Sequence, residues 1–415
     1  MPDPLSVSHR NNWRHTTFLF AVTSFVEALA FGHLGAFTPL FLQRELNVPP
    51  GAIPFWTGIL SSLGFVIGLP LLPFWGVWAD RFGRKLMIVR SSFVAALIYA
   101  LSGASTSVGM LACARLLSGF VFGNTGIMMA LQAEITPRER LGRTVALISA
   151  GSPIGMAVGP YLGGIVAHRA SLRVLLYADA ALTMLVVCAL ILFLHDEPHP
   201  AGAAESRPQG VFQAMASVAG TPRVLPLFLA VFVASYGTSM AQPYVPILIQ
   251  RLYRGASPAE VIGAILSASG VAMAVGTPFW GMLGDRAGHL RVLQACTLGI
   301  GLALAGQAAA RSVLQVAVWR GLQGFVQPGL GALSITLLAL YTPTEKRAHV
   351  LNLSLLPQQL SWFLGPLTGA RAAQISLALP FWIGASLLAG AWAVSWTLSE
   401  EPAALARNEQ AGSGD

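Results

Sequence analysis

Residues 76–85 read Gly-Val-Trp-Ala-Asp-Arg-Phe-Gly-Arg-Lys, and a related stretch, Gly-Met-Leu-Gly-Asp-Arg-Ala-Gly-His-Leu, occupies residues 281–290. The two stretches begin 205 residues apart. Three further landmarks recur at an offset of 205 or 206 residues: Arg115–Gly119 as Arg320–Gly324, Thr136–Arg140 as Thr342–Lys346, and Gly159–Gly163 as Gly365–Gly369. A constant offset indicates a duplicated chain. Parallel repeats of this kind are typical of transporters that rock two halves around a central site.

The composition indicates a membrane protein. Of the 415 residues, 54% are hydrophobic and only 10% are charged, too few charges to coat a soluble domain of this size. A bilayer-spanning helix needs roughly 20 apolar residues, and only a helix or a closed barrel satisfies its own backbone in lipid. We therefore predict an all-α membrane protein with twelve transmembrane helices in two pseudo-symmetric bundles of six. The predicted helices are about 14–42, 54–78, 85–105, 107–133, 141–167, 171–195, 223–251, 259–284, 289–310, 312–340, 347–371 and 375–398.

Four segments follow from this pattern. Residues 1–195 form the predicted N-terminal six-helix bundle, and residues 223–398 form the C-terminal one. Residues 196–222 are rich in Pro, Ala and Gly, which suits a flexible cytoplasmic linker. Residues 399–415 are expected to be a disordered cytoplasmic tail.

The distribution of basic residues predicts the topology. The formal net charge is +8, but with the N-terminus inside, 16 basic residues fall in inner segments and seven in outer ones. This asymmetry places both termini in the cytoplasm. No basic run alternates with aromatic residues, so we expect no nucleic-acid partner. The first apolar stretch is too long for a signal-peptide core and should be retained as a membrane anchor.

The chain lacks the usual signatures of catalysis. The three cysteines all fall inside predicted helices and indicate neither a disulfide framework nor a metal site. No P-loop, metal-ligand cluster or nucleophile motif is present. We expect no enzyme activity and no cofactor, and transport that runs on the proton gradient rather than on ATP.

The motifs carry a resemblance to a known family. The loop Gly76-x-x-x-Asp80-Arg81-x-Gly83-Arg84 resembles the signature loop of the major facilitator superfamily, and the likeness covers essentially the whole chain. Residues 151–164 read Gly-x-x-x-Gly-x-x-x-Gly-Pro-x-x-Gly-Gly, which is similar to the motif of the twelve-helix drug:proton antiporters. The second half keeps only a shorter version. The antiporter-motif residues are Gly155, Gly159, Pro160 and Gly163.

The resemblance implies two conformational devices. The repeated loop would latch the two halves in one state: Asp80 would face Lys346 and Asp285 would face Arg140, each beside a helix N-terminus, where a carboxylate gains roughly 0.3–2 kcal/mol. The alternative is that its basic residues only fix topology. The predicted gating-loop residues are Gly76, Asp80, Arg81, Gly83, Arg84, Asp285 and Arg286. The glycines of the fifth predicted helix would seal a close helix–helix seam, or else serve ordinary small-residue packing.

Glu27 is the strongest candidate for proton coupling. It lies mid-span in the first predicted helix, and an ionised carboxylate there costs several kcal/mol unless it is paired or hydrated. The family resemblance makes Arg115 its candidate partner, although Arg115 could instead donate to carbonyls near Gly32 or Gly35. The alternative for Glu27 is a static acid that stabilises the bundle.

Other polar residues in the predicted spans are weaker candidates for proton coupling. Asp179 lies on a helix that the family places at the periphery, which favours a structural role. Glu134 lies at the inner end of the fourth predicted helix, where Arg138 or Arg143 can pair with it. His33 could form a polar cavity wall or carry a proton.

The substrate cavity is predicted from helical spacing around Glu27, Arg115 and their repeats. Aromatic side chains, Met and a few amides suit a broad apolar pocket, although ordinary interhelical packing explains many of them equally well. The predicted lining residues are Phe31, Leu34, Phe122, Met129, Phe232, Tyr236, Ser239, Arg320, Gln327, Gln358 and Trp362.

We therefore expect a monomeric transporter in the bacterial cytoplasmic (inner) membrane that exports lipophilic, cationic or neutral small molecules in exchange for protons. Its partners would be the small-molecule substrate, protons and the lipid bilayer. Arg115 and Arg320 together leave an alternative open: proton-coupled transport of an organic anion or another specific metabolite, such as a siderophore or a sugar.

Overall fold

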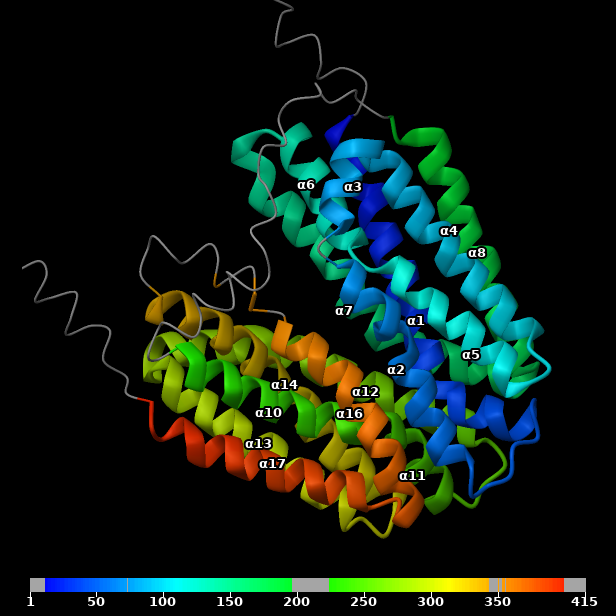
Figure 1. Cartoon of the computed structure of the whole chain (residues 1–415), viewed down its shortest axis with the longest axis vertical. Helices are drawn as coiled ribbons and strands as arrows, with labels where there is room; N and C mark the ends of the chain where they lie inside the picture. The colour runs from blue at the N-terminus through cyan, green and yellow to red at the C-terminus, as the bar shows by residue number, and fades with distance from the viewer. Residues whose placement is uncertain are drawn as a thin grey trace, which may run out of the picture. The chain divides into compact units, whose positions relative to one another are not determined.

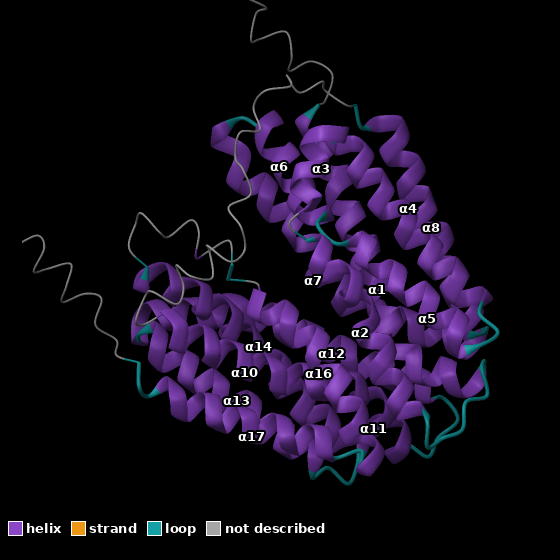
Figure 2. Cartoon of the chain, viewed as in Figure 1, coloured by secondary structure: helices purple, strands orange, loops and turns teal. Residues whose placement is uncertain are grey.

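The structure is a computed structural model that describes residues 12–72, 74–195, 224–342, 350, 353–354 and 356–398. Within these residues the chain consists of helices and connecting loops, without a strand (Figure 2). The predicted linker 196–222, the tail 399–415 and Lys346 lie outside the described residues. The chain divides into two compact units, each of which is described by itself.

Helices of the first repeat belong to the first unit. They are α1 (Trp13–Arg44), α2 (Ile53–Leu71), α3 (Phe74–Phe82), α4 (Arg84–Ala104), α5 (Val108–Leu116), the 3-10 helix η2 (Leu117–Val121), α6 (Asn124–Ile135), α7 (Arg138–Arg169) and α8 (Leu172–Phe193). The second repeat comprises α10 (Val224–Ala241), η3 (Gln242–Tyr244), α11 (Val245–Leu252), α12 (Pro258–Ala287), α13 (His289–Ala308), α14 (Val313–Tyr341), α16 (Leu356–Ile375) and α17 (Leu379–Ser395).

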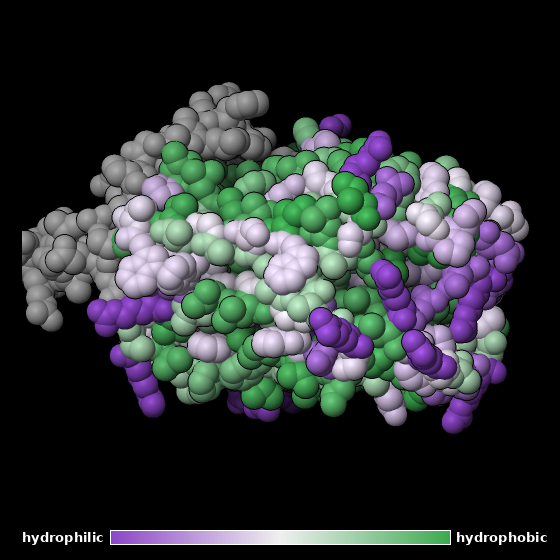
Figure 3. Space-filling view, turned by 90° about the horizontal axis from the view of Figure 1, so that it is seen from below, coloured by the Kyte–Doolittle hydropathy of each residue, from purple (hydrophilic) through white to green (hydrophobic). Residues whose placement is uncertain are grey.

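The predicted all-α membrane class is confirmed. Ten of the described helical segments are long and apolar enough to cross a membrane, and Leu379–Ser395 is a shorter apolar helix. Large apolar side chains are exposed on several of these helices, such as Leu185 and Phe193 of α8 and Leu314 of α14. Figure 3 shows one face of the molecule, where apolar residues cover much of the surface. On helices long enough to cross a membrane, such an exposed apolar surface is typical of contact with lipid.

Three predicted spans contain breaks in their helices. The span 54–78 divides into α2 and α3, the span 107–133 into α5, η2 and α6, and the span 223–251 into α10, η3 and α11. In the span 107–133, Gly123 adopts a left-handed conformation with φ of 85°, which ends the preceding turn. In the span 223–251, Pro243 and Pro246 cannot donate the backbone bonds that a continuous helix needs.

The two repeats share a pattern of helix pairing. In the first unit α1 packs mainly on α7 and α4 on α8, and in the second unit α10 packs on α16 and α13 on α17 (Figure 1). These pairs match one another in repeat order. The shared pattern supports the duplication that the sequence indicates.

The compact units differ from the predicted halves in one segment. Residues 243–270, which contain η3, α11 and the start of α12, group with the first unit. Small residues explain this grouping, because an added Cβ at Gly164 would lie 2.6 Å from the carbonyl oxygen of Ala259, and one at Gly270 would lie 2.7 Å from Cα of Ala157. The start of α12 thus approaches α7 at backbone distance.

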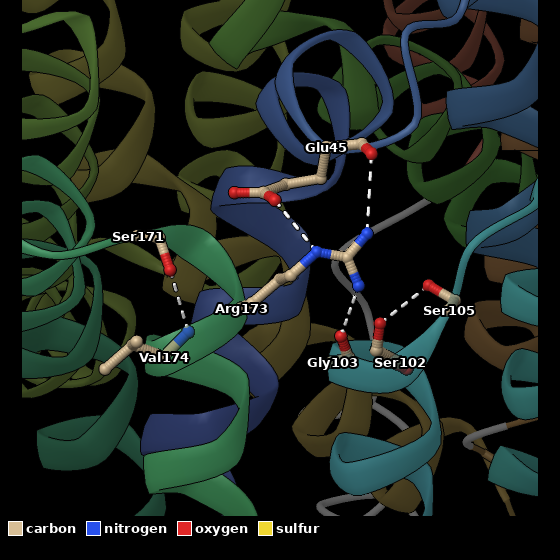
Figure 4. Close-up of polar contacts among 7 residues, drawn as sticks. All are labelled: Glu45, Ser102, Gly103, Ser105, Ser171, Arg173 and Val174. Carbon is tan, nitrogen blue, oxygen red and sulfur yellow. Dashed lines mark hydrogen bonds and ion pairs between the residues drawn. The ribbon is translucent and has the colours of Figure 1, made fainter.

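A single arginine ties three helix ends together in the first unit (Figure 4). Nε of Arg173 donates to the carboxylate of Glu45 at 2.9 Å, and Nη1 donates to the carbonyl of Gly103 at 2.7 Å. Nη2 lies 3.4 Å from the carbonyl of Glu45. Arg173 lies near the start of α8, Glu45 follows α1, and Gly103 lies near the end of α4. The planar guanidinium therefore fixes the relative positions of these ends.

Candidate functional site

The signature loop places its glycine where a left-handed conformation is required. Gly83 and Gly288 occupy the same position in the two repeats, just before α4 and α13, with φ of 92° and 96°. A residue with a Cβ would be strained there. In the first copy the loop also provides Arg84, which forms an ion pair with Glu134 at 2.5 Å. The sequence had predicted Arg138 or Arg143 as the ion-pair partner of Glu134 instead.

The other charged residues of the loop lie toward solvent. Asp80 and Arg81 are exposed. Asp285 is also exposed, and its carboxylate lies 3.2 Å from Nε2 of His289 one turn further along the chain. The contacts that would latch the two repeats stay a prediction.

Every fourth residue of α7 is a glycine where α7 meets α1. An added Cβ at Gly151 would lie 2.5 Å from the carbonyl oxygen of Ala21, and one at Gly159 would lie 2.8 Å from that of Leu29. The whole ladder pairs Gly151, Gly155, Gly159 and Gly163 of α7 with Ala21, Phe25, Leu29 and His33 of α1. The helices therefore approach so closely that no side chain fits between them.

Glu27 is held by neutral hydrogen-bond donors from two other helices. Ser92 of α4 donates its hydroxyl to Oε1 at 2.7 Å. The amide of Asn124 donates to Oε1 at 2.9 Å and to Oε2 at 3.0 Å. Asn124 begins α6, and the N-terminal end of a helix favours negative charge. Among the described residues, no basic side chain forms an ion pair with Glu27.

The predicted Glu27–Arg115 contact is not formed. Nη2 of Arg115 donates to the hydroxyl of Thr38 at 2.6 Å, one turn beyond the carbonyls that the sequence offered as an alternative. Thr38 is 11 residues after Glu27, and a helix rises 1.5 Å per residue, so the two positions lie about 16 Å apart along α1. The sequence places both residues toward one cavity, but it does not reveal this axial separation.

His33 joins α1 to two neighbouring helices. Its Nδ1 lies 2.9 and 3.0 Å from the two carboxylate oxygens of Asp179 on α8, and its Nε2 lies 2.8 Å from the carbonyl oxygen of Gly159 on α7. Both side chains are only 3% exposed. Asp179 therefore meets an α1 imidazole rather than Arg173, its neighbour in sequence.

A small cavity lies between these polar groups. His33, Thr38 and Arg115 line it, together with apolar side chains of α1, α5 and α8. Leu34 is the only one of the eleven predicted substrate-lining residues that contributes to this cavity. The cavity lies within the first unit. Because both His33 and Arg115 line it, the two side chains share the same small space.

The second unit holds a buried arginine that contacts a glutamine side chain. Nη1 of Arg320 donates to Oε1 of Gln323 at 2.9 Å, and the same oxygen accepts from Gln307 of α13. Arg320 occupies the position of Arg115 in the second repeat.

Other predicted cavity residues of the second unit belong to the α10–α16 contact. Phe232 and Tyr236 stack with ring centroids 5.8 Å apart, and the hydroxyl of Tyr236 lies 2.7 Å from that of Thr368. Ser239 donates to the carbonyl of Ser361 at 2.6 Å. Ser239 is thus engaged in helix packing. Gln327 and Gln358 are partly buried, and Trp362 is 46% exposed.

The remaining predicted residues of the first unit are dispersed. Phe31 is 59% exposed on α1. Phe122 packs edge-on against Phe65 with centroids 5.2 Å apart, and Met129 packs against the buried core. These three side chains therefore have different surroundings in the first unit, and their role in binding substrate stays a prediction.

Sequence reasoning did not identify Ser92 and Asn124, and it did not pair Thr38 with Arg115 or Asp179 with His33. Ser92 and Asn124 hold Glu27, Thr38 holds Arg115, and Asp179 holds His33. Thr38 and Asp179 each stand alone among apolar residues, which was the available signal, whereas Ser92 follows Arg90 and Ser91 and Asn124 precedes Thr125.

These features define a multi-pass helical membrane protein built from two repeats, with a polar interior in the first. The sequence profile of the Major Facilitator Superfamily matches residues 20–254 and again residues 227–414. The chain belongs to the Major Facilitator Superfamily, a family of transporters. The predicted family and fold class are therefore confirmed.

Several relatives carry drug-resistance names. The chain is 27% identical over 370 residues to "Multidrug resistance protein MdtG" of Rahnella sp. (strain Y9602), covering 89% of this chain and 88% of the relative. It is also 27% identical over 360 residues to the protein of the same name from Enterobacter lignolyticus (strain SCF1), covering 86% of each.

Solved structures share the fold. The nucleoside transporter NupG aligns with a TM-score of 0.73 at 13% identity, covering 92% of this chain and 98% of NupG. The human organic anion transporter MFSD10 (TETRAN) aligns with a TM-score of 0.64 at 16% identity, covering 92% and 99%. At such identities the likeness concerns the fold alone.

Proposed function

We propose that this transporter exports lipophilic, cationic or neutral small molecules in exchange for protons, and that Glu27 binds the exchanged proton. The relatives named multidrug resistance proteins support the export of drugs. The surroundings of Glu27 support the coupling to protons. The transporter would act as a monomer in the bacterial cytoplasmic membrane with both termini in the cytoplasm, as the distribution of basic residues indicates.

The observation that carries this proposal is the neutral shell of Glu27. A carboxylate in an ion pair resists protonation, because gaining a proton breaks the pair. Glu27 instead faces the hydroxyl of Ser92 and the amide of Asn124. A hydroxyl donates to an ionised carboxylate or accepts from a protonated carboxyl, and the amide donates to either form. Both protonation states of Glu27 therefore keep hydrogen-bond partners.

Reconstituted vesicles with an imposed pH gradient test the proposal. Wild-type protein should move a lipophilic cation against its concentration gradient, and Glu27→Gln should abolish this uphill movement because glutamine keeps the shape but cannot titrate. Glu139→Gln is the matched control, since Glu139 is an exposed carboxylate in the first turn of α7. Gradient-driven transport by Glu27→Gln at the wild-type rate would overturn the role of Glu27.

A substrate panel tests the class of cargo. Purified protein would be offered a lipophilic cation, a neutral drug and an organic anion, each at two pH values. We expect the cation and the neutral drug to bind. Preferential binding of the anion would favour the alternative in which Arg115 and Arg320 attract an anionic substrate.

A further inference from the structure

The hydrogen bonds of His33 and Asp179 determine where hydrogens must lie on the imidazole and between the two side chains. A carbonyl oxygen only accepts hydrogen bonds, so Nε2 of His33 must carry a hydrogen to bond with Gly159. Nδ1 faces both oxygens of Asp179. If Nδ1 and the carboxyl group both lacked a hydrogen, lone pairs would oppose one another. The geometry therefore requires a second hydrogen between Nδ1 and Asp179.

We propose that His33 and Asp179 form a second proton-binding site, which ties α1 to α7 while its proton is bound and releases the Gly159 carbonyl when the proton leaves. With the proton, the pair is neutral overall, either as imidazolium with carboxylate or as imidazole with carboxylic acid. Without it, the pair carries one negative charge, and the proton has passed to water.

Loss of the proton leaves the imidazole with one hydrogen for two acceptors. A hydrogen bond to an ionised carboxylate is roughly twice as strong as one to a neutral carbonyl. The remaining hydrogen therefore stays on Nδ1, facing Asp179. Nε2 then presents a lone pair to the carbonyl of Gly159, and this contact is lost.

The hydrogen bond between His33 and the Gly159 carbonyl lies where α1 and α7 pack closely, so its loss would affect how these two helices are held together. Gly159 precedes Pro160 and belongs to the glycine ladder against α1. An added Cβ at Gly163 would lie 2.5 Å from Cδ2 of His33, so the imidazole fits only because residue 163 is a glycine. His33 thus supplies a side-chain hydrogen bond at the end of a seam that otherwise consists of van der Waals contacts.

Other ionisable groups surround the pair. Tyr99 of α4 is buried within electrostatic range of Asp179, Glu27 and Arg115, and Arg115 of α5 shares the small cavity with His33. The cation of Arg115 would offset the negative charge that proton loss creates. Of the other helices that pack on α1, α2 carries no ionisable side chain. The remaining groups on these helices are Lys85 and Arg90 of α4, Arg173, Tyr177 and Cys188 of α8, Glu134 of α6, which pairs with Arg84, Arg251 of α11, and Tyr161 and His168 of α7 together with the charged residues at its two ends.

Hydrogen–deuterium exchange of the α7 peptide around residues 155–167 tests the site in purified protein, without substrate or transport. After correction for intrinsic exchange, protection in the wild type should fall with rising pH, by up to about tenfold per pH unit if one proton leaves per opening. Asp179→Asn should remove this dependence, because its amide can donate to Nδ1 while Nε2–H stays on Gly159. Glu27→Gln should retain it, which separates this site from the proposed coupling site.

A second measurement detects the bound proton directly in the wild-type protein, and a variant serves only to assign the signals. Histidine labelled with ¹⁵N reports hydrogens on each ring nitrogen, His33→Gln identifies the His33 signals, and infrared spectra report the carboxyl proton. Over the pH range in which the protein stays folded, the pair should lose one hydrogen as the pH rises. No change in either group over this range would overturn the proposal, as would wild-type pH dependence of exchange in Asp179→Asn.

Discussion

At the scale of the residue, Arg173 shows how charge serves architecture in the first unit. Its guanidinium reaches the Glu45 carboxylate and the carbonyls of Glu45 and Gly103. The side chain is 29% exposed, so the contact lies at the rim of the helical bundle. A planar group with five fixed donors can satisfy acceptors in several directions, whereas an ammonium group on a flexible stem cannot match that geometry.

Arg173→Lys should therefore lower the stability of the protein by about 1–3 kcal/mol, the range for leaving hydrogen-bonded groups unsatisfied. Thermal unfolding in detergent can be followed by the loss of helical circular dichroism. Arg311→Lys, at an exposed arginine, is the control and should change nothing. Equal melting temperatures for both variants would show that the Arg173 contacts contribute little.

The sequence identified single residues of the polar interior but not their partners. Glu27 stands out because it is a carboxylate in the middle of an apolar run. Its donors Ser92 and Asn124 lie 65 and 97 residues away, and such a distance in sequence gives no indication of contact. The assignment of Arg115 to Glu27 rested on the family resemblance, and the contact with Thr38 replaces it.

At the scale of the element, α7 carries two small-residue faces. Its glycine ladder meets α1, while Gly164 and the carbonyl of Pro160 meet the start of α12 at Ala259 and Gly263. Helices that touch at backbone distance cannot tolerate a side chain at the contact without moving apart. The close approach therefore constrains α7 on both sides.

Gly159→Leu should force α1 and α7 apart and abolish coupled transport or make the protein leak protons. Gly142→Leu on the same helix is the matched control, because an added Cβ at Gly142 meets nothing within 4 Å. Drug efflux and proton flux in vesicles would be measured for both variants. Normal coupled transport by Gly159→Leu would contradict a functional role of the seam.

Most helix positions were predictable to within a few residues, although α16 begins at Leu356 rather than near residue 347, and helix breaks were not predictable. Hydropathy detects an apolar stretch regardless of whether its backbone is continuous, and so the span 107–133 seemed unbroken. The break at Gly123 matters for the site, since it begins α6 at Asn124 and directs the Asn124 amide to Glu27. A glycine inside an apolar run does not by itself reveal a left-handed conformation.

At the scale of the whole molecule, the duplication preserves the helix pairing but not Glu27 and His33. Glu27 corresponds to Phe232 and His33 to Thr238 at the offset of 205 residues. Neither α10 nor α17 contains a carboxylate. The second repeat therefore keeps the helix pairing and an arginine, Arg320, while proton binding is proposed for the first repeat alone.

The repeated loop is expected to control how the two repeats move. Asp80→Asn should weaken the closed cytoplasmic side and slow turnover, because the neutral amide loses its attraction to a helix N-terminus. Accessibility of cysteines introduced at the inner ends of the second and eleventh predicted helices would report the change, with expression level as the control. Unchanged accessibility together with normal transport would eliminate the latch.

The most direct test of the account is proton release on substrate binding to purified protein. If a lipophilic cation and a proton compete for Glu27, cation binding should release about one proton per cation in the wild type, because the two binding equilibria are reciprocally linked. Glu27→Gln should release none while still binding the cation, and Glu139→Gln should behave like the wild type. Wild-type proton release from Glu27→Gln would contradict the assignment of Glu27 as the coupling site.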